Sequence, residues 1–182
     1  MGLRKVISES NGVTSIVAIV VLLGAGFVIY RSLLPAPSVL MTTKWMVDLN
    51  TLELVAAPVE TISPADLDRG EFDYGRMGVA GAVVDAQVYS CGDPTAIEAG
   101  MTPEDLEAID ATLAFVMRYD PLSLEMLQNP SEEAATSGAP RRFVSGLAVD
   151  EWFPEMSPRG MQLQSNSVPL CDDGRQPLPT RP

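Results

Sequence analysis

The stretch VAGAVVDAQVYSC, residues 79–91, contains the clearest β-strand pattern of the sequence. Small and β-branched apolar residues recur at every second position, so one face of the strand is apolar while the other turns polar midway. A strand of this length and apolarity is expected near the centre of a sheet, and the CGDP sequence at residues 91–94 ends it. The apolar face consists of Ala80, Ala82, Val84, Ala86 and Val88.

A β-hairpin is predicted before this strand, in residues 42–58. Apolar and polar residues alternate there up to a turn at Asn50 and Thr51, and the alternation then resumes. A turn of this size needs one residue with positive φ, so glycine would suit position 52 better than Leu52 does.

The segments on either side of the central part are less regular. Residues 59–78 are polar and interrupted by proline and glycine, which predicts a long loop with one helical turn over Pro64–Leu67, capped by Ser63. Residues 141–153 predict a strand pair or a bent strand, with Asp150 near the turn.

Residues 102–119, TPEDLEAIDATLAFVMRY, are predicted to form the longest helix of this part of the chain. Thr102 is a suitable N-cap and Pro103 suits the first helical position. Acidic residues then face the positive end of the helix dipole, and Arg118 faces the negative end. The expected buried stripe is Leu106, Ile109, Leu113 and Val116.

The same capping signal predicts two shorter helices. Asp120 precedes Pro121 in a segment that Pro130 ends, and Ser157 precedes Pro158. Strands and helices in mixed order, with too few alternations for a parallel sheet, predict an α+β fold with a mainly antiparallel sheet and one or two packed helices.

The N-terminal part of the chain has a different character. From Val13 to Tyr30 no residue is charged, and the apolar run continues past Arg31 to Leu34. Roughly 20 apolar residues in a helix span a bilayer core of about 30 Å, so residues 13–34 predict a single transmembrane helix. The alternatives are a cleaved export signal, for which the run is long, and a buried core helix.

This segment also sets the predicted topology. Arg4 and Lys5 precede the apolar run, whereas Arg31 and the more distant Lys44 follow it, a bias that places the short N-terminus in the cytoplasm. The expected location is therefore the cell inner membrane, with a single pass. The predicted parts are a cytoplasmic N-terminus at 1–12, the transmembrane helix at 13–34, a spacer at 35–42, an extracytoplasmic α+β domain at 43–171 and a flexible tail at 172–182.

The part of the chain after Tyr30 is strongly acidic. It carries ten Lys and Arg residues against 23 Asp and Glu residues, a net charge of −13. Such a surface repels nucleic acid, so we expect no nucleic-acid partner. Outside the cytoplasm Cys91 and Cys171 could pair as a disulfide, and the alternative is two unpaired thiols.

A short motif at the start of the apolar run resembles the processing site of type IV prepilins. It is the sequence Gly12–Val17, preceded by basic residues. The chain departs from that family at Val17, where pilins have a glutamate, and at Pro35 and Pro37, which should end a helix that pilins continue. The resemblance implies a pilin-like minor subunit of a type II secretion or type IV pilus system.

A second set of motifs is scattered through the domain: WMVDLNT at 45–51, VYSCGD at 88–93, EWF at 151–153, SPRG at 157–160 and Cys171. Together they resemble an uncharacterised family of bacterial single-pass envelope proteins that carry a short N-terminal anchor. Leu52 and Pro94 depart from that family's pattern, which has a glycine and a second cysteine there. The resemblance implies membrane anchoring and no particular reaction.

No catalytic arrangement is evident. The chain has no histidine, which excludes Ser-His-Asp and Cys-His catalysis in their usual form and leaves few metal ligands. Pairs of carboxylates, such as Asp85 with Asp93 or Glu104 with Asp105, leave a weak hydrolase as an alternative. Three aromatic residues are candidates for a ligand platform or for the core: Trp45, Tyr89 and Trp152.

Together these patterns predict a membrane-anchored, non-enzymatic envelope protein. Its partners would be the lipid bilayer, through the N-terminal helix, and another envelope protein, through the acidic domain. We expect no catalytic, cofactor-binding or metal-binding residues, and no cofactor.

Overall fold

The computed structural model describes residues 21, 23–24, 42–128 and 140–182. The chain divides into two units, Met1–Leu40 and Met41–Pro182. The predicted transmembrane helix at 13–34 lies almost entirely outside the described residues. Within the described part of the chain, no helix is both long enough and apolar enough to cross a membrane.

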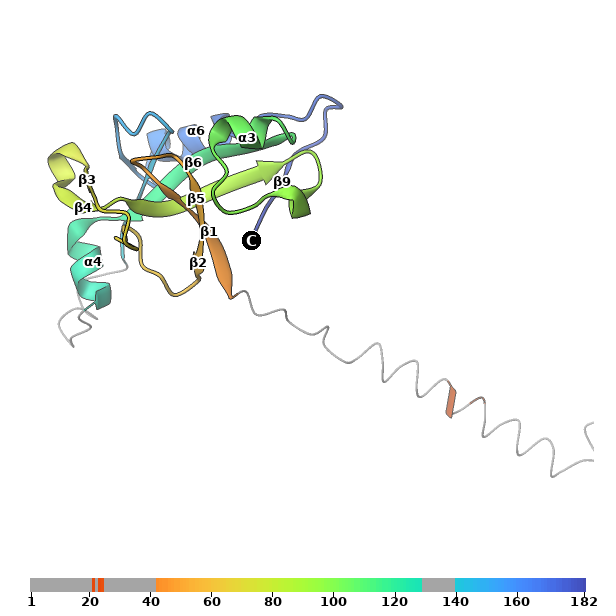
Figure 1. The fold of residues 1–182 in the computed structure, drawn as a ribbon, viewed down its shortest axis with the longest axis horizontal. Helices are drawn as coiled ribbons and strands as arrows, with labels where there is room; N and C mark the ends of the chain where they lie inside the picture. Colours follow the sequence, from red (N-terminus) through yellow and green to blue (C-terminus); the bar gives the residue numbers. More distant parts are fainter. Residues whose placement is uncertain (1–20, 22, 25–41, 129–139) are drawn as a thin grey trace, which may run out of the picture. The chain divides into compact units, whose positions relative to one another are not determined.

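The second unit is a mixed α+β domain with a mainly antiparallel sheet, as predicted (Figure 1). The main sheet has the strand order β2–β1–β5–β6–β7–β8, and β9 also pairs with β5. A small second sheet pairs β3 with β4. The strands are β1 Thr43–Asp48, β2 Leu54–Pro58, β3 Glu71–Asp73, β4 Val79–Gly81, β5 Val83–Ser90, β6 Ala111–Tyr119, β7 Arg142–Ser145, β8 Phe153–Pro154 and β9 Leu178–Pro179.

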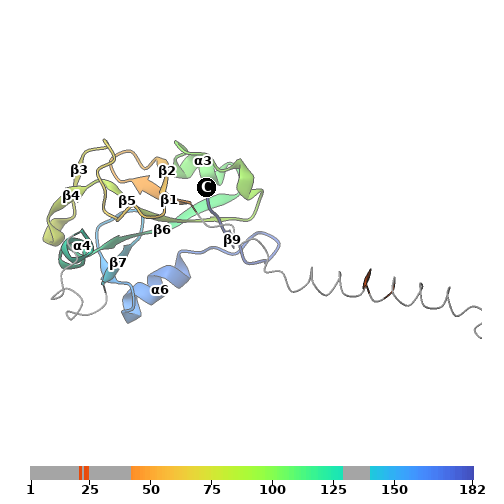
Figure 2. The ribbon, with the colours of Figure 1, turned by 90° about the horizontal axis from the view of Figure 1, so that it is seen from below.

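Short helices lie on both sides of the main sheet. Figure 2 shows α6 on one side of β6, and α3 with the β1–β2 hairpin on the other. The helices in the described part of this domain are α3 Pro103–Glu107, α4 Pro121–Gln128 and α6 Pro158–Asn166, and the 3-10 turns are η1 Gly75–Met77 and η2 Pro94–Ala96.

The predicted N-terminal hairpin is confirmed as β1 and β2, with Val47 opposite Leu54. Asp48 organises the turn, because its carboxylate accepts hydrogen bonds from the backbone N–H of Asn50 and the hydroxyl of Thr51. Leu52 has a φ of 61°, the positive value that the turn demands. A leucine therefore occupies a backbone conformation that glycine adopts at lower cost.

The strand at the centre of the sequence is also central in the sheet. One edge of β5 pairs with β6, and the other pairs first with β1 and then with β9. The predicted strand began at Val79, but the structure breaks it before Val83. Residues 79–81 form β4 instead, which pairs with β3 in the small second sheet.

The predicted helix at 102–119 is wrong beyond its first turn. Thr102 caps α3 in a capping box with Asp105, as the sequence indicated, but the helix ends at Glu107. Asp110 then adopts a φ of 56°, and residues 111–119 form β6. The run LAFVMR, residues 113–118, is buried on both faces, so an apolar stripe at helical spacing is also satisfied by a strand that packs on two sides.

Two further expectations differ from the structure. Pro64–Leu67 does not form a helical turn, because Ala65 instead makes a β-bridge to Val83. The segment expected as a flexible tail at 172–182 contains β9, and the Thr180 backbone N–H donates to the Val88 carbonyl. In contrast, the predicted caps at Asp120 and Ser157 and the strand pair β7–β8 are confirmed.

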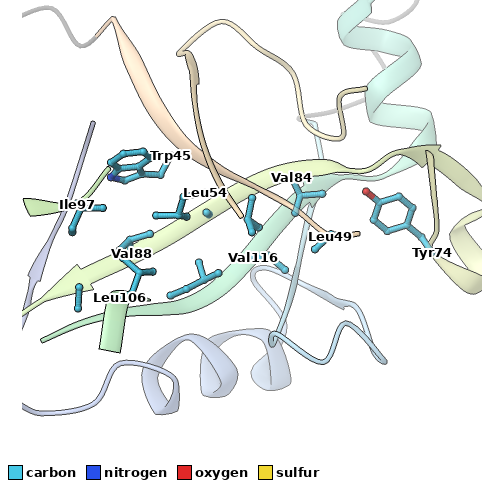
Figure 3. Close-up of a cluster of buried hydrophobic side chains, with 13 residues drawn as sticks. Trp45, Leu49, Leu54, Tyr74, Val84, Val88, Ile97, Leu106 and Val116 are labelled. Atoms are coloured by element: carbon cyan, nitrogen blue, oxygen red, sulfur yellow. The ribbon is translucent and has the colours of Figure 1, made fainter. Parts of the chain in front are cut away.

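The described part of the domain has two larger apolar clusters and a small third one of Met46, Ala57 and Val83. The larger of the first two is formed by side chains of β1, β2, β5, β6 and α3, together with Tyr74 just before η1. Figure 3 shows it as a row of side chains that runs from Trp45 and Ile97 at one end to Tyr74 at the other. The smaller cluster, under α6, consists of Ala114, Phe115, Met117 and Val144, with Leu163 packed against it.

Candidate functional site

A cavity of about 730 Å³ opens at the Tyr74 end of the larger cluster. We call it the aromatic cavity. Residues around η1, strand β7, the β7–β8 loop and the start of α6 supply its walls, so it forms only when distant parts of the chain fold together. The lining residues are Asp73–Met77, Phe143, Val149–Phe153 and Arg159.

Arg118 lies directly behind this aromatic wall. Its guanidinium carbon is 3.8 Å from the ring centroid of Tyr74 and 6.0 Å from that of Trp152. In the β6–β7 register it lies opposite Phe143, a third residue of the cavity wall. The guanidinium is thus held by cation–π contacts rather than by an acid.

The burial of Arg118 is unusual for a charged side chain. It is 1 % exposed, and none of the ion pairs in the described part of the chain includes it. Burial lowers the pKa of Arg118, while Tyr74 and Asp120 oppose that change. The Nε–H donates to the carbonyl of Tyr119, but the Nη1 atom is buried without a hydrogen-bond partner.

Tyr74 is positioned as a neutral donor. Burial raises the pKa of its phenol, the Arg118 charge lowers it and the Asp48 carboxylate raises it again, with burial dominant. The hydroxyl donates to the carbonyl of Gly81 over 2.6 Å. The ring also meets Phe72 and Trp152 edge-to-face, which fixes its orientation.

A second cavity, of about 500 Å³, surrounds a buried carboxylate on β5. Asp85 accepts a hydrogen bond from the Nζ of Lys44 and lies 3.4 Å from the Nη2 of Arg142. Lys44 also donates to the carbonyl of Thr61. Glu155 lies 3.9 Å from the Nε of Arg142, so the two cations are balanced by two acids. This cluster ties β1, β5 and β7 together.

The two cysteines are brought together in the structure. The sulfurs of Cys91 and Cys171 lie 2.02 Å apart, which is the distance of a disulfide. They line a third cavity, of about 360 Å³, together with acidic residues that include Glu107, Asp110 and Asp172. Among the described residues, no group of three or more potential metal ligands is arranged to hold an ion.

The carboxylates considered as acid pairs have other partners in the structure. Asp93 accepts from the backbone N–H and the hydroxyl of Thr95 at the start of η2, and Asp105 completes the capping box with Thr102. Both are exposed, and these hydrogen bonds lower the pKa of each carboxyl. The Asp85 carboxylate is paired with Lys44 and Arg142.

The three candidate platform rings do not converge. Trp45 lies in the larger cluster and Trp152 packs against that cluster, whereas Tyr89 packs against the smaller cluster. Tyr74 was not singled out from the sequence, and Arg118 was assigned to the end of a helix, whereas it lies in strand β6. A signal for Arg118 was present, because a strand over residues 111–119 places it on the same face as the buried Val116.

Comparison with known proteins adds no identification: no family model, no curated protein and no solved structure matches the chain.

Proposed function

We propose that the chain is a membrane-anchored, non-enzymatic envelope protein. Residues 13–34 would hold it in the inner membrane, and the domain that begins at Thr43 would face the extracytoplasmic side, where it contacts another envelope protein. The resemblance to single-pass bacterial envelope proteins agrees with this proposal.

The observation that carries the proposal is a combination of two features. A charge-free apolar run of bilayer length precedes a domain whose two cysteines lie at disulfide distance. Stable disulfides persist mainly in oxidising compartments outside the cytoplasm. The acidity of the domain supports a role away from nucleic acid and anionic lipid headgroups.

Membrane association and topology can be tested with the full chain. A C-terminal alkaline phosphatase fusion is expected to be active, and the protein is expected to stay with membranes after an alkaline carbonate wash. An arginine in the middle of the predicted span, Leu23→Arg, should release it, because a charge at the bilayer centre is costly. Ser38→Arg, in the predicted spacer, is the matched control. Intact full-length protein in the washed soluble fraction would contradict the anchor.

The N-terminus of the mature protein distinguishes anchoring from pilin-like processing. Intact-mass measurement is expected to give a chain that retains Gly12 and the residues before it. A mature chain that begins at Val13 with a methylated α-amino group would instead favour a minor pilin subunit.

The interaction role needs its own experiment. Cross-linking in intact cells, followed by purification in detergent, is expected to yield one discrete adduct with another envelope protein. The adduct should disappear when the domain is replaced by an unrelated domain on the same anchor. Recovery of the uncross-linked chain alone would contradict a role in protein–protein contact.

A further inference from the structure

Two N–H donors beside the aromatic cavity have no acceptor. They are Nη1 of Arg118 and Nε1 of Trp152, both buried and without a hydrogen-bond partner in the described part of the chain. Trp152 lines the cavity, whereas Arg118 lies behind the Tyr74 ring. A buried donor left unpaired is costly, and a buried charge without an opposite charge is more so. Arg118 meets both conditions, since it is 1 % exposed and belongs to no ion pair there.

The two donors belong to the same part of the fold. The guanidinium of Arg118 lies within 6.0 Å of the Trp152 ring centroid, and Trp152 lines the aromatic cavity together with Tyr74. Trp45 also has a buried, unpaired Nε1, but it lies at the other end of the larger cluster and lines a different cavity. Nε of Arg142 is buried and unpaired as well, and Arg142 lines that other cavity with Trp45, but it forms ion pairs with Asp85 and Glu155. Of these four donors in the described part of the chain, Nη1 of Arg118 alone belongs to a charged group without an ion-pair partner.

We propose that the aromatic cavity binds the carboxylate of a ligand with an apolar body. Nη1 of the guanidinium and the indole N–H would each donate to one oxygen of the carboxylate, and the hydrogen bond to the guanidinium would be charge-assisted. The apolar body would lie against Met77, Phe143 and Val149, which line the same cavity. A free aryl carboxylic acid and the terminal carboxylate of a peptide both carry this chemistry.

The charges at the mouth of the cavity favour a singly charged ligand. Arg76 and Arg159 line it and attract an anion, whereas Asp73, Asp150 and Glu151 line it as well and would repel a multiply charged one. A phosphate is thus a poorer ligand than a carboxylate. The proposed site consists only of residues of the folded domain. It therefore does not depend on the side of a membrane that the domain faces.

Binding requires a small movement of one side chain. Both donors are covered in the structure, so the Trp152 ring must turn for a carboxylate to reach them. Trp152 is only partly buried and lies in the segment between β7 and β8, just before Phe153. In contrast, Tyr74 is buried and its hydroxyl is anchored to Gly81, so the guanidinium keeps its position while the indole moves.

The site can be tested by NMR spectroscopy of the full chain in detergent micelles, in which the indole N–H resonances are followed as ligand is added. The protein has two tryptophans, so Trp45 is an internal reference for Trp152. Phenylacetate is expected to shift the Trp152 resonance and leave that of Trp45 unchanged, while the neutral analogue phenylacetamide shifts neither. A shift of equal size with phenylacetamide, or no shift of Trp152 at saturating phenylacetate, would overturn the proposal.

Peptides distinguish the two sources of the carboxylate. A short peptide that ends in phenylalanine with a free carboxylate is compared with the same peptide as its C-terminal amide. Tighter binding of the free-acid peptide than of phenylacetate assigns the site to a chain terminus, and the reverse order assigns it to a small acid. If the acid and amide peptides bind equally and phenylacetate does not shift the Trp152 resonance, the proposal that the cavity binds a carboxylate is wrong.

Two substitutions separate the donors from the fold. Arg118→Met keeps an unbranched side chain and removes the guanidinium charge, and it should weaken phenylacetate binding by roughly 10- to 100-fold. Trp152→Phe keeps a ring and removes the N–H, and should weaken binding by roughly 3- to 10-fold, read by the change in thermal stability with ligand. Arg175→Gln, an exposed arginine that does not line this cavity, is the control and should leave binding unchanged. If Arg118→Met fails to fold, Trp152→Phe still decides, and unchanged binding in it refutes the proposal.

Discussion

The guanidinium carbon of Arg118 lies 3.8 Å from the ring centroid of Tyr74, so an aromatic ring faces a charge that has no carboxylate partner in the described part of the chain. The ring is held from its other end, where the hydroxyl donates to the carbonyl of Gly81. This pair connects the sheet to the segment that carries η1 and forms the back of the aromatic cavity.

Tyr74→Phe tests how firmly the ring is held. The variant keeps the ring over Arg118 but leaves the Gly81 carbonyl without its donor, so the free energy of unfolding should fall by about 1–2 kcal/mol. Urea unfolding followed by fluorescence measures the change. Tyr89→Phe is the control, since no hydrogen bond of the Tyr89 hydroxyl is seen among the described residues, and it should have little effect. Equal effects in the two variants would contradict the role given to the Tyr74 hydroxyl.

Asp85→Asn should destabilise the domain by about 2–3 kcal/mol, because Lys44 and Arg142 both lose their shared carboxylate. The cost is below that of a fully buried pair since both cations keep some contact with solvent. Chemical denaturation of both proteins in the same detergent measures it. Asp173→Asn, which alters the exposed pair with Arg175, is the control and should leave stability nearly unchanged. A stable Asp85→Asn variant would show that the cluster does not hold β1 to β7.

Gly81→Ala should be among the more damaging small substitutions. A Cβ at this position would lie 2.2 Å from the carbonyl carbon of Ala65, and backbone atoms cannot move aside cheaply. We expect a loss of about 2 kcal/mol or more in the free energy of unfolding. Gly146→Ala is matched, since a Cβ there has no heavy atom within 4 Å. Comparable stability of the two variants would mean that the Ala65–Val83 bridge is not a fixed part of the fold.

The Cys91–Cys171 link should contribute to stability through the length of chain that it closes. The two residues are 80 positions apart, and the chain-entropy estimate for such a loop is about 4 kcal/mol. Unfolding with and without reductant measures the difference, and the Cys91→Ser/Cys171→Ser double variant should match the reduced protein. If both thiols react with an alkylating reagent before reduction, in protein isolated from native envelopes, no link exists there.

The capping box of α3 predicts a pH dependence. Hydrogen bonds from Thr102 lower the pKa of Asp105 below its usual 3.8, so the carboxylate stabilises the folded state above that value. The contribution is lost as the pH falls through the lower folded pKa. Asp105→Ala should therefore be less stable than the parent at neutral pH, and the gap should narrow below pH 3.8. Glu104→Ala, one position earlier but outside the capping box, should show a smaller gap. A gap that is independent of pH would contradict the role of the carboxylate.

Local signals in the sequence predicted local structure well. Thr102, Asp120 and Ser157 cap helices as expected, because a cap depends on a side chain and the backbone within the next few residues. The alternation of apolar and polar residues likewise predicted the β1–β2 hairpin. The size of its turn predicted a positive φ near position 52, which Leu52 adopts.

The error at residues 108–119 has a physical cause. Leu106, Ile109, Leu113 and Val116 fit one face of a helix, but a strand buried on both faces is also a nearly continuous apolar run. Neighbouring strands decide between the two, because β5 and β7 satisfy the backbone groups of β6 on both edges. No residue within the run carries that information.

By itself, the sequence determined the positions of the caps, the hairpin, the central strand and the mixed α+β class, since each depends on residues within a few positions of one another. Only the tertiary structure decided which charges and rings meet. Arg118, Tyr74 and Trp152 come from three separate parts of the chain, and Asp85 meets Lys44 and Arg142 across strand pairings. Side-chain chemistry is fixed by sequence, but the burial and neighbours that give it a role are created when distant strands pair.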